Sequence, residues 1–546
     1  MPKLIPAHAR EAPARRKLMW IFLGVLSLLV FLLYLWNQRF GQPEDFDQME
    51  DQFKYGSIGS DHPLAQAPIP YWLWKVLPTI LPPASTMPSI VPVAGGQPVK
   101  LVPANAVNSY EAFGLVVEDK RDAPHGAAAG QPAFDRPIGF SRRRVLGMDF
   151  VGMNCAFCHL GTFKATEGAP RQLVLGGTGN AVDVEQYFLY LFTALTSERL
   201  TADLVMPAID AELTRQSAEL GWLQRLLYRY LLIPQLPKYL KGLEQGTFDF
   251  IVPNNANRLP EFGPGRVDTW SIYKRVFVNP PQHDSIAGTS DFTSLWNQKA
   301  REGMRLHWDG NTDVLVERNV VSALSLIGKR VEYLDFDRLT RVTDWIHGVL
   351  PPRYPDRFPQ ALLDKGQVAV RPDLLTRGAA VFNEQCARCH APGADRLGRV
   401  EPLVDLGTDG GRIKAFTAAL RDGLNTLGTD KWQLRHFELQ TGYVNAPLDG
   451  LWLRAPYLHN GSVPTLTDLL NPPDKRPTRF CRGAEVYDWE NLGFVSATKQ
   501  VDGRESCANH FLYDTKVAGN SNSGHLYGTA LSADDKRALL EFLKTL

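Results

Sequence analysis

The chain has 546 residues, of which 44% are hydrophobic and 21% are charged, and its formal net charge is +1. This length suffices for two or three hydrophobic cores, and the composition is that of a folded protein. A balanced charge provides no long-range field that would attract nucleic acid or an acidic substrate, so neither is expected as a partner.

The first predicted element is an apolar segment near the N-terminus. Residues 18–36 carry no charge, and as a helix they would extend about 28 Å, close to the thickness of a bilayer's hydrocarbon core. Basic residues precede this segment, and the acidic stretch PEDFDQMED follows it. By the positive-inside rule we expect a cytoplasmic tail over residues 1–17, a single inner-membrane anchor over residues 18–37, and the bulk of the chain in the periplasm.

A cleaved signal peptide is the alternative interpretation of this segment. The apolar core of a signal peptide is usually shorter, and small residues mark its cleavage site. Here the segment WNQR follows at residues 36–39. The pattern favours an uncleaved anchor.

Residues 38–105 are rich in proline and short on long periodic patterns. They also contain too many aromatic residues for a free linker. We expect an extended arm packed on the domain that follows.

The remainder of the chain is predicted to be mainly helical, with long loops. In residues 106–365, stretches such as VDVEQYFLYLFTALTSERL and AIDAELTRQSAELGWLQRLLYRYLL repeat apolar residues at steps of three and four. LPPRYPDRFP at residues 350–359 breaks this pattern, and a new helix is expected from about Asp373. A closing helix is expected after Ser532, which is a good N-cap residue followed by acids. We therefore predict a first domain over residues 106–365 and a second over residues 366–546.

Two copies of the pattern C-x-x-C-H carry the main chemical signal. They are Cys155, Cys158 and His159 in the first copy, and Cys386, Cys389 and His390 in the second. This spacing attaches two cysteine sulfurs to one haem and points the histidine at the iron. A zinc site would use the four cysteines and leave both histidines unexplained. The pattern predicts two covalently bound c-type haems, with His159 and His390 as metal ligands.

The distribution of methionines limits the sixth ligand of the second haem. All eight methionines lie at or before Met304, so the second domain contains none. Unless a methionine of the first domain reaches the second haem, its iron cannot have a His/Met ligand pair. Its sixth position is then either open or occupied by a second histidine. The histidines of that domain are His436, His459, His510 and His525.

The first haem has more candidates for its sixth ligand, and the sequence does not choose among them. Met148 and Met153 lie too near the attachment site to reach the far face of the haem. The sequence candidates are Met148, Met153, Met206, Met304, His125, His283, His307 and His347.

Two cysteines remain outside the haem motifs, Cys481 and Cys507. An even remainder in an exported chain favours one disulfide. Two unpaired buried thiols are the alternative.

Four further segments carry a family resemblance. They are GPGRVDTW at 263–270, LHWDGN at 306–311, LRAPYLHNGSVPTL at 453–466 and GNSNSGHLYG at 519–528. With the two haem motifs, they resemble the bacterial dihaem cytochrome c peroxidase superfamily, most of all its branch of haem-type rubber oxygenases. The resemblance implies two cytochrome c-like domains, with chemistry at the first haem and an electron relay at the second.

The resemblance also implies roles for individual residues. Trp308, in the WDG motif, would lie between the haems and carry electrons. His525 matches the place of a distal ligand, which would make the second haem bis-histidine. This differs from typical dihaem peroxidases, whose electron-donating haem has a methionine ligand.

Three more residues enter the predicted site by the same resemblance. His459 would bond a haem propionate or line the region between the haems, with ligation of the second haem as a second choice. His307 would reach the distal pocket of the first haem, and a core or surface role is the alternative. Arg266 would pair with a propionate or form a structural salt bridge. A calcium ion lies between the domains of some relatives, and the sequence leaves it open here.

These observations predict a haem oxidoreductase that acts on peroxide or O₂ at the first haem and exchanges electrons with a periplasmic donor or acceptor. A pure electron carrier with two six-coordinate haems is the alternative, and a scaffold with purely structural haem ranks last. The sequence does not fix the substrate or the oligomeric state.

Overall fold

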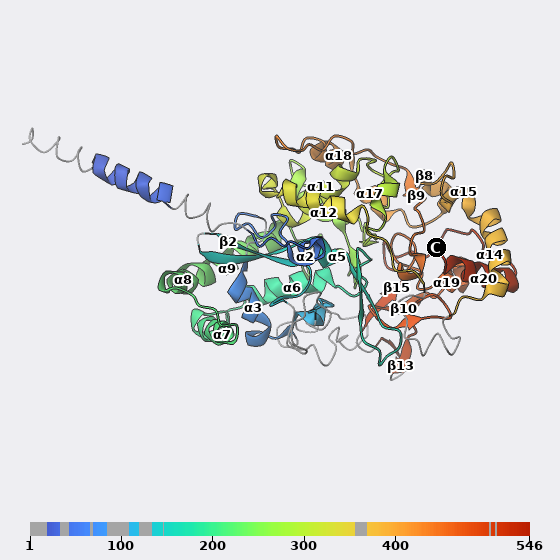
Figure 1. Cartoon of the computed structure of the whole chain (residues 1–546), viewed down its shortest axis with the longest axis horizontal. Coiled ribbons are helices and arrows are strands. Elements are labelled where there is room, and N and C mark those ends of the chain that lie inside the picture. The colour runs from blue at the N-terminus through green and yellow to red at the C-terminus, as the bar shows by residue number, and fades with distance from the viewer. Residues whose placement is uncertain are drawn as a thin grey trace, which may run out of the picture.

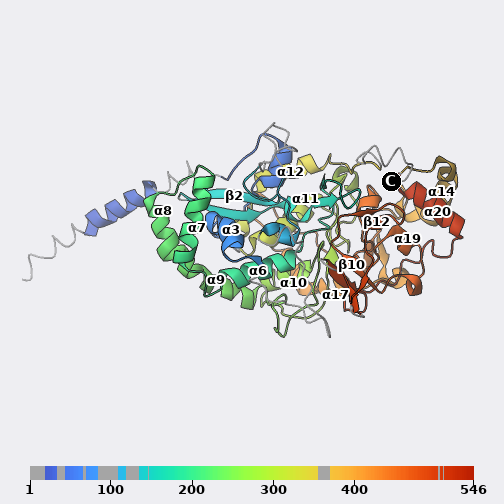
Figure 2. The same ribbon diagram turned by 90° about the horizontal axis from the view of Figure 1, so that it is seen from below.

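The structure is a computed structural model of the chain. It describes residues 19–32, 43–65, 69–83, 109–118, 134–145, 147–354, 369–501, 504–507 and 510–546. Within these ranges the chain forms two regions that lie side by side along the long axis of the molecule, the earlier one blue to yellow and the later one orange to red (Figures 1 and 2).

The prediction of a membrane-spanning helix over residues 18–37 is corrected by the structure. Residues 19–32 are helical and exposed. Across the described ranges, no helix is both long enough and apolar enough to cross a membrane. The predicted tail at 1–17, together with residues 18 and 33–37 of the predicted anchor, lies outside the described residues.

The first region contains most of the long helices. Its helices are α2 (Met49–Tyr55), α3 (Tyr71–Ile80), α5 (Cys155–Cys158), α6 (Val184–Leu195), α7 (Ala202–Arg215), α8 (Trp222–Leu227), η4 (Tyr228–Leu232), α9 (Ile233–Gly246), α10 (Thr269–Phe277), α11 (Leu315–Ile327) and α12 (Phe336–Ile346).

The second region contains shorter helices and more loop. Its helices are α14 (Pro372–Gln385), α15 (Ala387–His390), α16 (Leu403–Leu406), α17 (Gly411–Ala415), α18 (Ala418–Leu424), α19 (Leu466–Leu469) and α20 (Ala533–Leu543). Short 3₁₀ turns also occur in both regions, at Tyr110–Phe113, Gln298–Arg301, Val331–Tyr333, Leu451–Leu453 and Pro473–Lys475.

Small antiparallel sheets accompany the helices, a feature that the sequence did not predict. The described residues form one three-stranded sheet, in the order β1-β3-β2, and six two-stranded sheets. Several strands have only two residues, too few to display the alternation by which strands are recognised. The strands are β1 (Ile69–Pro70), β2 (Phe140–Val145), β3 (Met148–Met153), β4 (Leu160–Phe163), β5 (Gln172–Leu175), β6 (Arg266–Val267), β7 (Ser290–Asp291), β8 (Val400–Pro402), β9 (Gly442–Val444), β10 (Arg479–Arg482), β11 (Tyr487–Asp488), β12 (Gly493–Phe494), β13 (Lys499–Val501), β14 (Arg504–Ser506) and β15 (Phe511–Asp514).

The expected extended arm at 38–105 contains helices in its described parts. Helices α2 and α3 lie there, and β1 pairs with β3. The aromatic residues Trp72 and Trp74 of α3 are buried in the largest core cluster together with residues of α6. The described parts of this proline-rich stretch pack through buried aromatic side chains, and not through a regular spacing of apolar residues that could be recognised in the sequence.

Helix boundaries agree with several sequence signals. The helix expected near Asp373 begins at Pro372, and α20 follows Ser532, whose side chain accepts the N–H of Asp535. The long stretch after residue 207 is interrupted instead of continuous, because Ser217 adopts a positive φ of 53° and α8 restarts after Gly221.

The hydrophobic cores join the two regions. One cluster packs α10 and α11 against α17 and α18, through buried side chains such as Trp270 and Phe416. A second cluster combines Phe163 and Trp296 with Trp452. The predicted division at residues 365 and 366 therefore separates chain segments that share buried surfaces.

Candidate haem-binding sites

The first C-x-x-C-H copy forms a single helical turn directly after strand β3. Asn154 caps this turn, because its side chain accepts the N–H of Ala156 at 3.0 Å and donates to the carbonyl of Gly56. The turn, α5, carries Cys155 and Cys158 on one side, and His159 terminates it. The strand and the cap thus fix the direction in which both sulfurs and the imidazole point.

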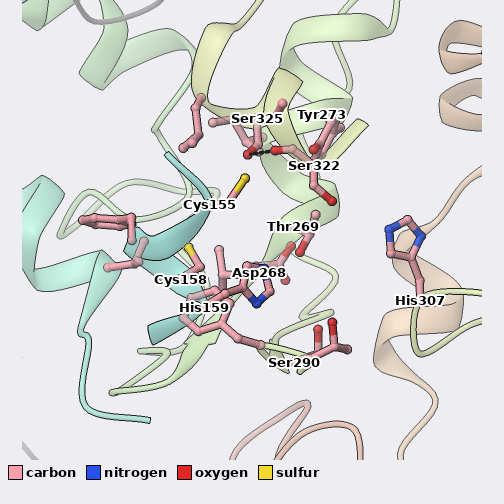
Figure 3. A pocket seen from close by; sticks show the side chains of 18 of the residues that line it. Cys155, Cys158, His159, Asp268, Thr269, Tyr273, Ser290, His307, Ser322 and Ser325 are labelled. Carbon is pink, nitrogen blue, oxygen red and sulfur yellow. Dashed lines mark hydrogen bonds between the residues drawn. The ribbon is translucent and has the colours of Figure 1, made fainter. Parts of the chain in front are cut away.

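A large cavity opens beside this turn. Cys155, Cys158 and His159 line it, and its empty volume of about 1480 Å³ includes space open to solvent. Figure 3 shows the two sulfurs and His159 on one side and His307 across the open space. Six phenylalanines line it as well, Phe157, Phe188, Phe248, Phe250, Phe262 and Phe292.

The electrostatics of this turn suit iron ligation by a neutral imidazole. Burial raises the pKa of Cys155 to about 11 and that of Cys158 to about 12. Burial, with a contribution from the positive charge of Arg318, lowers the pKa of His159 to about 3. The imidazole is therefore neutral, which is the form that binds a metal. The residues present fit a covalently bound haem.

The second C-x-x-C-H copy also forms a helical turn, α15, after the long helix α14. The Nδ1 of His390 lies 2.9 Å from the carbonyl oxygen of Ala446. A bond from Nδ1–H to this carbonyl leaves Nε2 without its proton and available to a metal, the arrangement that orients metal-binding histidines. The second copy therefore fits a haem as well.

His525 is held near His390 by a docked loop. Its backbone N–H donates to the carbonyl of Leu406 at 2.9 Å. Arg476 binds the carbonyls of Asn522, Gly524 and His525. Gly524 has a φ of +77°, and a Cβ there would meet the backbone of residues 406–408 at 2.4 Å, so only glycine permits this close contact.

The imidazole of His525 is neutral and lacks a partner at one nitrogen. Its Nδ1 is buried without a hydrogen bond. Burial, followed by the charge of His390, lowers the pKa of His525 to about 4. The two histidines thus lie within electrostatic range of each other, as the sequence-based ligand assignment requires, although that assignment stays a prediction.

The other histidines of the second region have different surroundings. His436 is mostly exposed, and its Nδ1 bonds Glu317 at 2.6 Å. His459 is buried and stacks on Tyr443, with ring centroids 3.9 Å apart. His510 is half-buried.

Among the candidate sixth ligands of the first haem, His307 alone lies in the wall of the first cavity, within the described part of the chain. His125 lies outside the described residues. The Nδ1 of His307 bonds the side-chain oxygen of Asn311 at 2.7 Å. Burial lowers the pKa of His307 to about 3, with smaller effects of the cations Arg318 and Arg412.

The loop that carries His307 and Trp308 docks onto the second region. The N–H of Val444, in β9, donates to the carbonyl of Trp308 at 2.9 Å. Gly310 has a φ of +65°, and a Cβ there would lie 2.4 Å from the side chain of Val400. The close contact explains the glycine of the WDGN motif.

Trp308 is placed in the walls of two cavities. Its indole N–H donates to the carbonyl of Asp291 at 2.8 Å, and the residue lines both the first cavity and a second one. The second cavity is also lined by Ala446, whose carbonyl orients His390. Trp308 thus lies in the wall between a space beside His159 and a space beside His390.

Two residues of the predicted site lie apart from these cavities. Within the described residues, neither Arg266 nor His459 lines the first or the second cavity. Arg266 is fully buried, donates to Asn520 at 2.7 Å and stacks over Tyr513. Its Nε also lies 3.9 Å from a carboxylate oxygen of Asp291, and its role toward a haem propionate stays a prediction.

Sequence reasoning missed five charged residues of the first cavity, Asp268, Asp291, Arg412, Glu185 and Arg318. Glu185 accepts the N–H of Phe262 and pairs with Arg258, and burial raises its pKa. Arg318 bonds the side chains of Asn319 and Thr293 at 3.1 and 3.2 Å. Glu185 and Arg318 occupy ordinary amphipathic helices, so no local pattern marked them.

The remaining cysteines form the expected bond. Cys481 and Cys507 are joined in a disulfide, which confirms that prediction. For calcium, no group of three or more His, Cys, Asp or Glu side chains that could hold a metal occurs among the described residues.

Comparisons with known proteins add a partial identification. A family model described as RoxA-like, cytochrome c-like, matches residues 442–481, which include most of β9 and the LRAPYLHNGSVPTL segment. The chain is 29% identical over 306 residues to the uncharacterized protein y4iM of Sinorhizobium fredii, covering 48% of this chain and 66% of that protein, just under two thirds of its length. It is 25% identical over 535 residues to the uncharacterized protein y4iJ of the same organism, covering 80% and 84% of the two chains.

These similarities support a c-type cytochrome with covalently bound haem, similar to the rubber-oxygenase branch. They do not single out the dihaem cytochrome c peroxidase superfamily.

Proposed function

We propose that the protein is a dihaem oxidoreductase that reacts with O₂ or peroxide at the first C-x-x-C-H site and passes electrons through the second. The observation that carries this proposal is the difference between the two sites. The first faces a mostly apolar cavity, whereas the second has a neutral histidine, His525, held near His390.

Haem iron supplies redox and O₂ chemistry, and the protein controls access and potential. At the first site His159 is the proposed iron ligand, and the phenylalanines of the cavity wall give the haem apolar surroundings. At the second site His390 and His525 are the proposed ligands. Trp308, which lines both cavities, is the proposed route for electrons between them.

A distal acid or base is available at the first site. Three acidic side chains line the cavity, Glu185, Asp268 and Asp291. Asp268 accepts the N–H groups of Ser271 and Gly288, and Asp291 pairs with Arg482. Glu185 lies beside Phe188 and Phe262, and its raised pKa makes it the acid best suited to exchange a proton there.

A pure electron carrier is the second candidate, and His307 is the observation that favours it. This histidine is neutral, lines the first cavity and lies across it from His159. If it bound the iron, the first haem would have two histidine ligands and no open position.

One set of spectra tests these alternatives. We expect the air-oxidised protein to contain a high-spin fraction that reacts with peroxide or holds O₂, and the reduced protein to bind CO. An entirely low-spin protein that binds neither CO nor cyanide would reject the catalytic proposal. In that case His307→Ala should create a high-spin signal. The control His347→Ala, at a half-buried histidine of the same region, should not.

We also propose that the chain works in an oxidising compartment and exchanges electrons with a separate redox protein there. The disulfide between Cys481 and Cys507 supports this, because such bonds persist outside the reducing cytosol. Cell fractionation of the native host would locate the protein. Recovery in the cytosol with both thiols reduced would reject this part.

A further inference from the structure

The second cavity contains an unusual concentration of positive charge. Four arginines line it, Arg301, Arg305, Arg318 and Arg454. We call these four residues the arginine chamber. The only carboxylate among the described lining residues is that of Asp291, and it is engaged by Arg482 at 2.8 Å.

The guanidinium groups of the chamber are incompletely satisfied. The Nε of Arg301, the Nη1 of Arg305, and the Nε and Nη2 of Arg454 are buried without hydrogen bonds. Arg301 has one carboxylate partner, Asp449 at 3.3 Å, and the same carboxylate lies 3.9 Å from Arg454. Buried donors without partners are costly, so the chamber has the chemistry of an anion site.

Arg318 adds a buried cation with only neutral partners. The residue is 8% exposed, and its guanidinium donates to the side-chain amide oxygen of Asn319 and to the hydroxyl of Thr293. Burial and the neighbouring charge of Arg301 lower its pKa to about 10. Burial also lowers the pKa of Arg454 to about 9, and Arg301 contributes again. An anion in the chamber would relieve this repulsion.

The position of the chamber indicates which anion it receives. Arg454 donates to the carbonyl of Pro447 at 2.7 Å, and Pro447 follows Ala446, whose carbonyl orients His390. A haem held at Cys386 and Cys389 carries two propionate carboxylates on the ring edge away from its thioether bonds.

We propose that the arginine chamber binds the propionate carboxylates of the haem attached at Cys386 and Cys389. Arginine suits this task because its planar fork presents paired donors to a carboxylate. The chamber then holds the propionates of the second haem against the wall that contains Trp308. This inference rests on the proposed function only in requiring a haem at the second site.

The main test is the reduction potential of each haem in the full-length holoprotein carrying Arg454→Gln. Losing this cation leaves a propionate uncompensated, which favours the oxidised iron. We expect the reduction equilibrium of the second haem to shift at least about tenfold toward the oxidised form, or about 59 mV for a one-electron couple. Arg454→Lys, which retains the charge but lacks the fork, should give a smaller shift.

Arg396→Gln is the matched control. Arg396 is a cation near Cys389, but it bonds Glu401 and does not line the chamber. It should shift the potential of the second haem less than Arg454→Gln does. If Arg454→Gln fails to fold, Arg301→Gln provides the same readout, because its guanidinium lines the chamber and shares Asp449 with Arg454.

Three results would overturn the inference. One is an unchanged potential of the second haem in both Arg454→Gln and Arg301→Gln. Another is a shift confined to the first haem. The third is a saturable change in the visible spectrum on adding formate, abolished by Arg454→Gln, because that would assign the chamber to a free carboxylate. Absence of haem from the second site, measured by haem content, would instead reject the proposed function.

Discussion

The two C-x-x-C-H sites share a five-residue pattern and differ in almost everything around it. At the first, the turn follows a strand and faces a cavity lined by phenylalanines, and His307 lies on the far side. At the second, the turn ends a long helix, and a separate loop brings His525 near His390. The pattern specifies attachment and one axial ligand, whereas remote segments determine what faces the other side of the iron.

The largest expected effect tests whether both sites hold haem. Replacing Cys155 and Cys158 with alanine should remove one of two covalent haems, because both thioether bonds are lost. The matched double replacement of Cys386 and Cys389 should remove the other. Haem content per chain and the intact mass of the protein measure this, and an unchanged haem content in either variant would contradict a dihaem protein.

The second prediction tests the difference in axial ligation. His525→Ala should convert the low-spin signal of the second haem completely to high-spin and leave the first haem unchanged. Electron paramagnetic resonance of the oxidised protein separates the two signals. His510→Ala is the control from the same region and should change neither. A low-spin signal that survives His525→Ala would remove His525 as the ligand.

The third prediction concerns the scaffold that supports the His525 loop. Cys481 lies on β10, which pairs with β15 just before that loop, and Cys507 lies just ahead of β15. Replacing both cysteines with serine should lower the free energy of unfolding by about 3 kcal/mol, since the disulfide closes a 26-residue loop. Denaturant titration measures this loss.

The same variant sharpens the comparison between the sites. In this variant we expect the spin state of the second haem to change at a lower denaturant concentration than the spin state of the first haem. Simultaneous changes at both haems would show that the disulfide supports the whole molecule rather than the second site.

The smallest expected effect concerns communication between the sites. Trp308→Phe removes the indole and its bond to Asp291, so electron exchange between the haems should slow by at least about tenfold, equivalent to ~1.4 kcal/mol in the barrier. Flash-reduction kinetics measure the rate. Trp345→Phe, in the same region but away from both cavities within the described residues, is the control. An unchanged rate would place the electron route elsewhere.

Local signals in the sequence were sufficient for several parts of the fold. Ser532 and the acids after it defined the start of α20, and the cysteine spacing defined the turns at both haem motifs. The apolar run near the N-terminus predicted a membrane-spanning helix, whereas no helix among the described residues is long and apolar enough to be one. The two-residue strands gave no readable pattern.

The sequence by itself predicted the attachment cysteines of both C-x-x-C-H motifs and their histidines, His159 and His390, as iron ligands. It also showed that two cysteines remain outside these motifs and that no methionine follows Met304. These depend on residue type and on spacing over a few positions. Only the tertiary structure decided that Trp308 lines both cavities, that Arg266 is bound to Asn520 and that four arginines converge beside Ala446. Each of these contacts joins segments far apart in the chain, where burial and packing, rather than local pattern, select the neighbours.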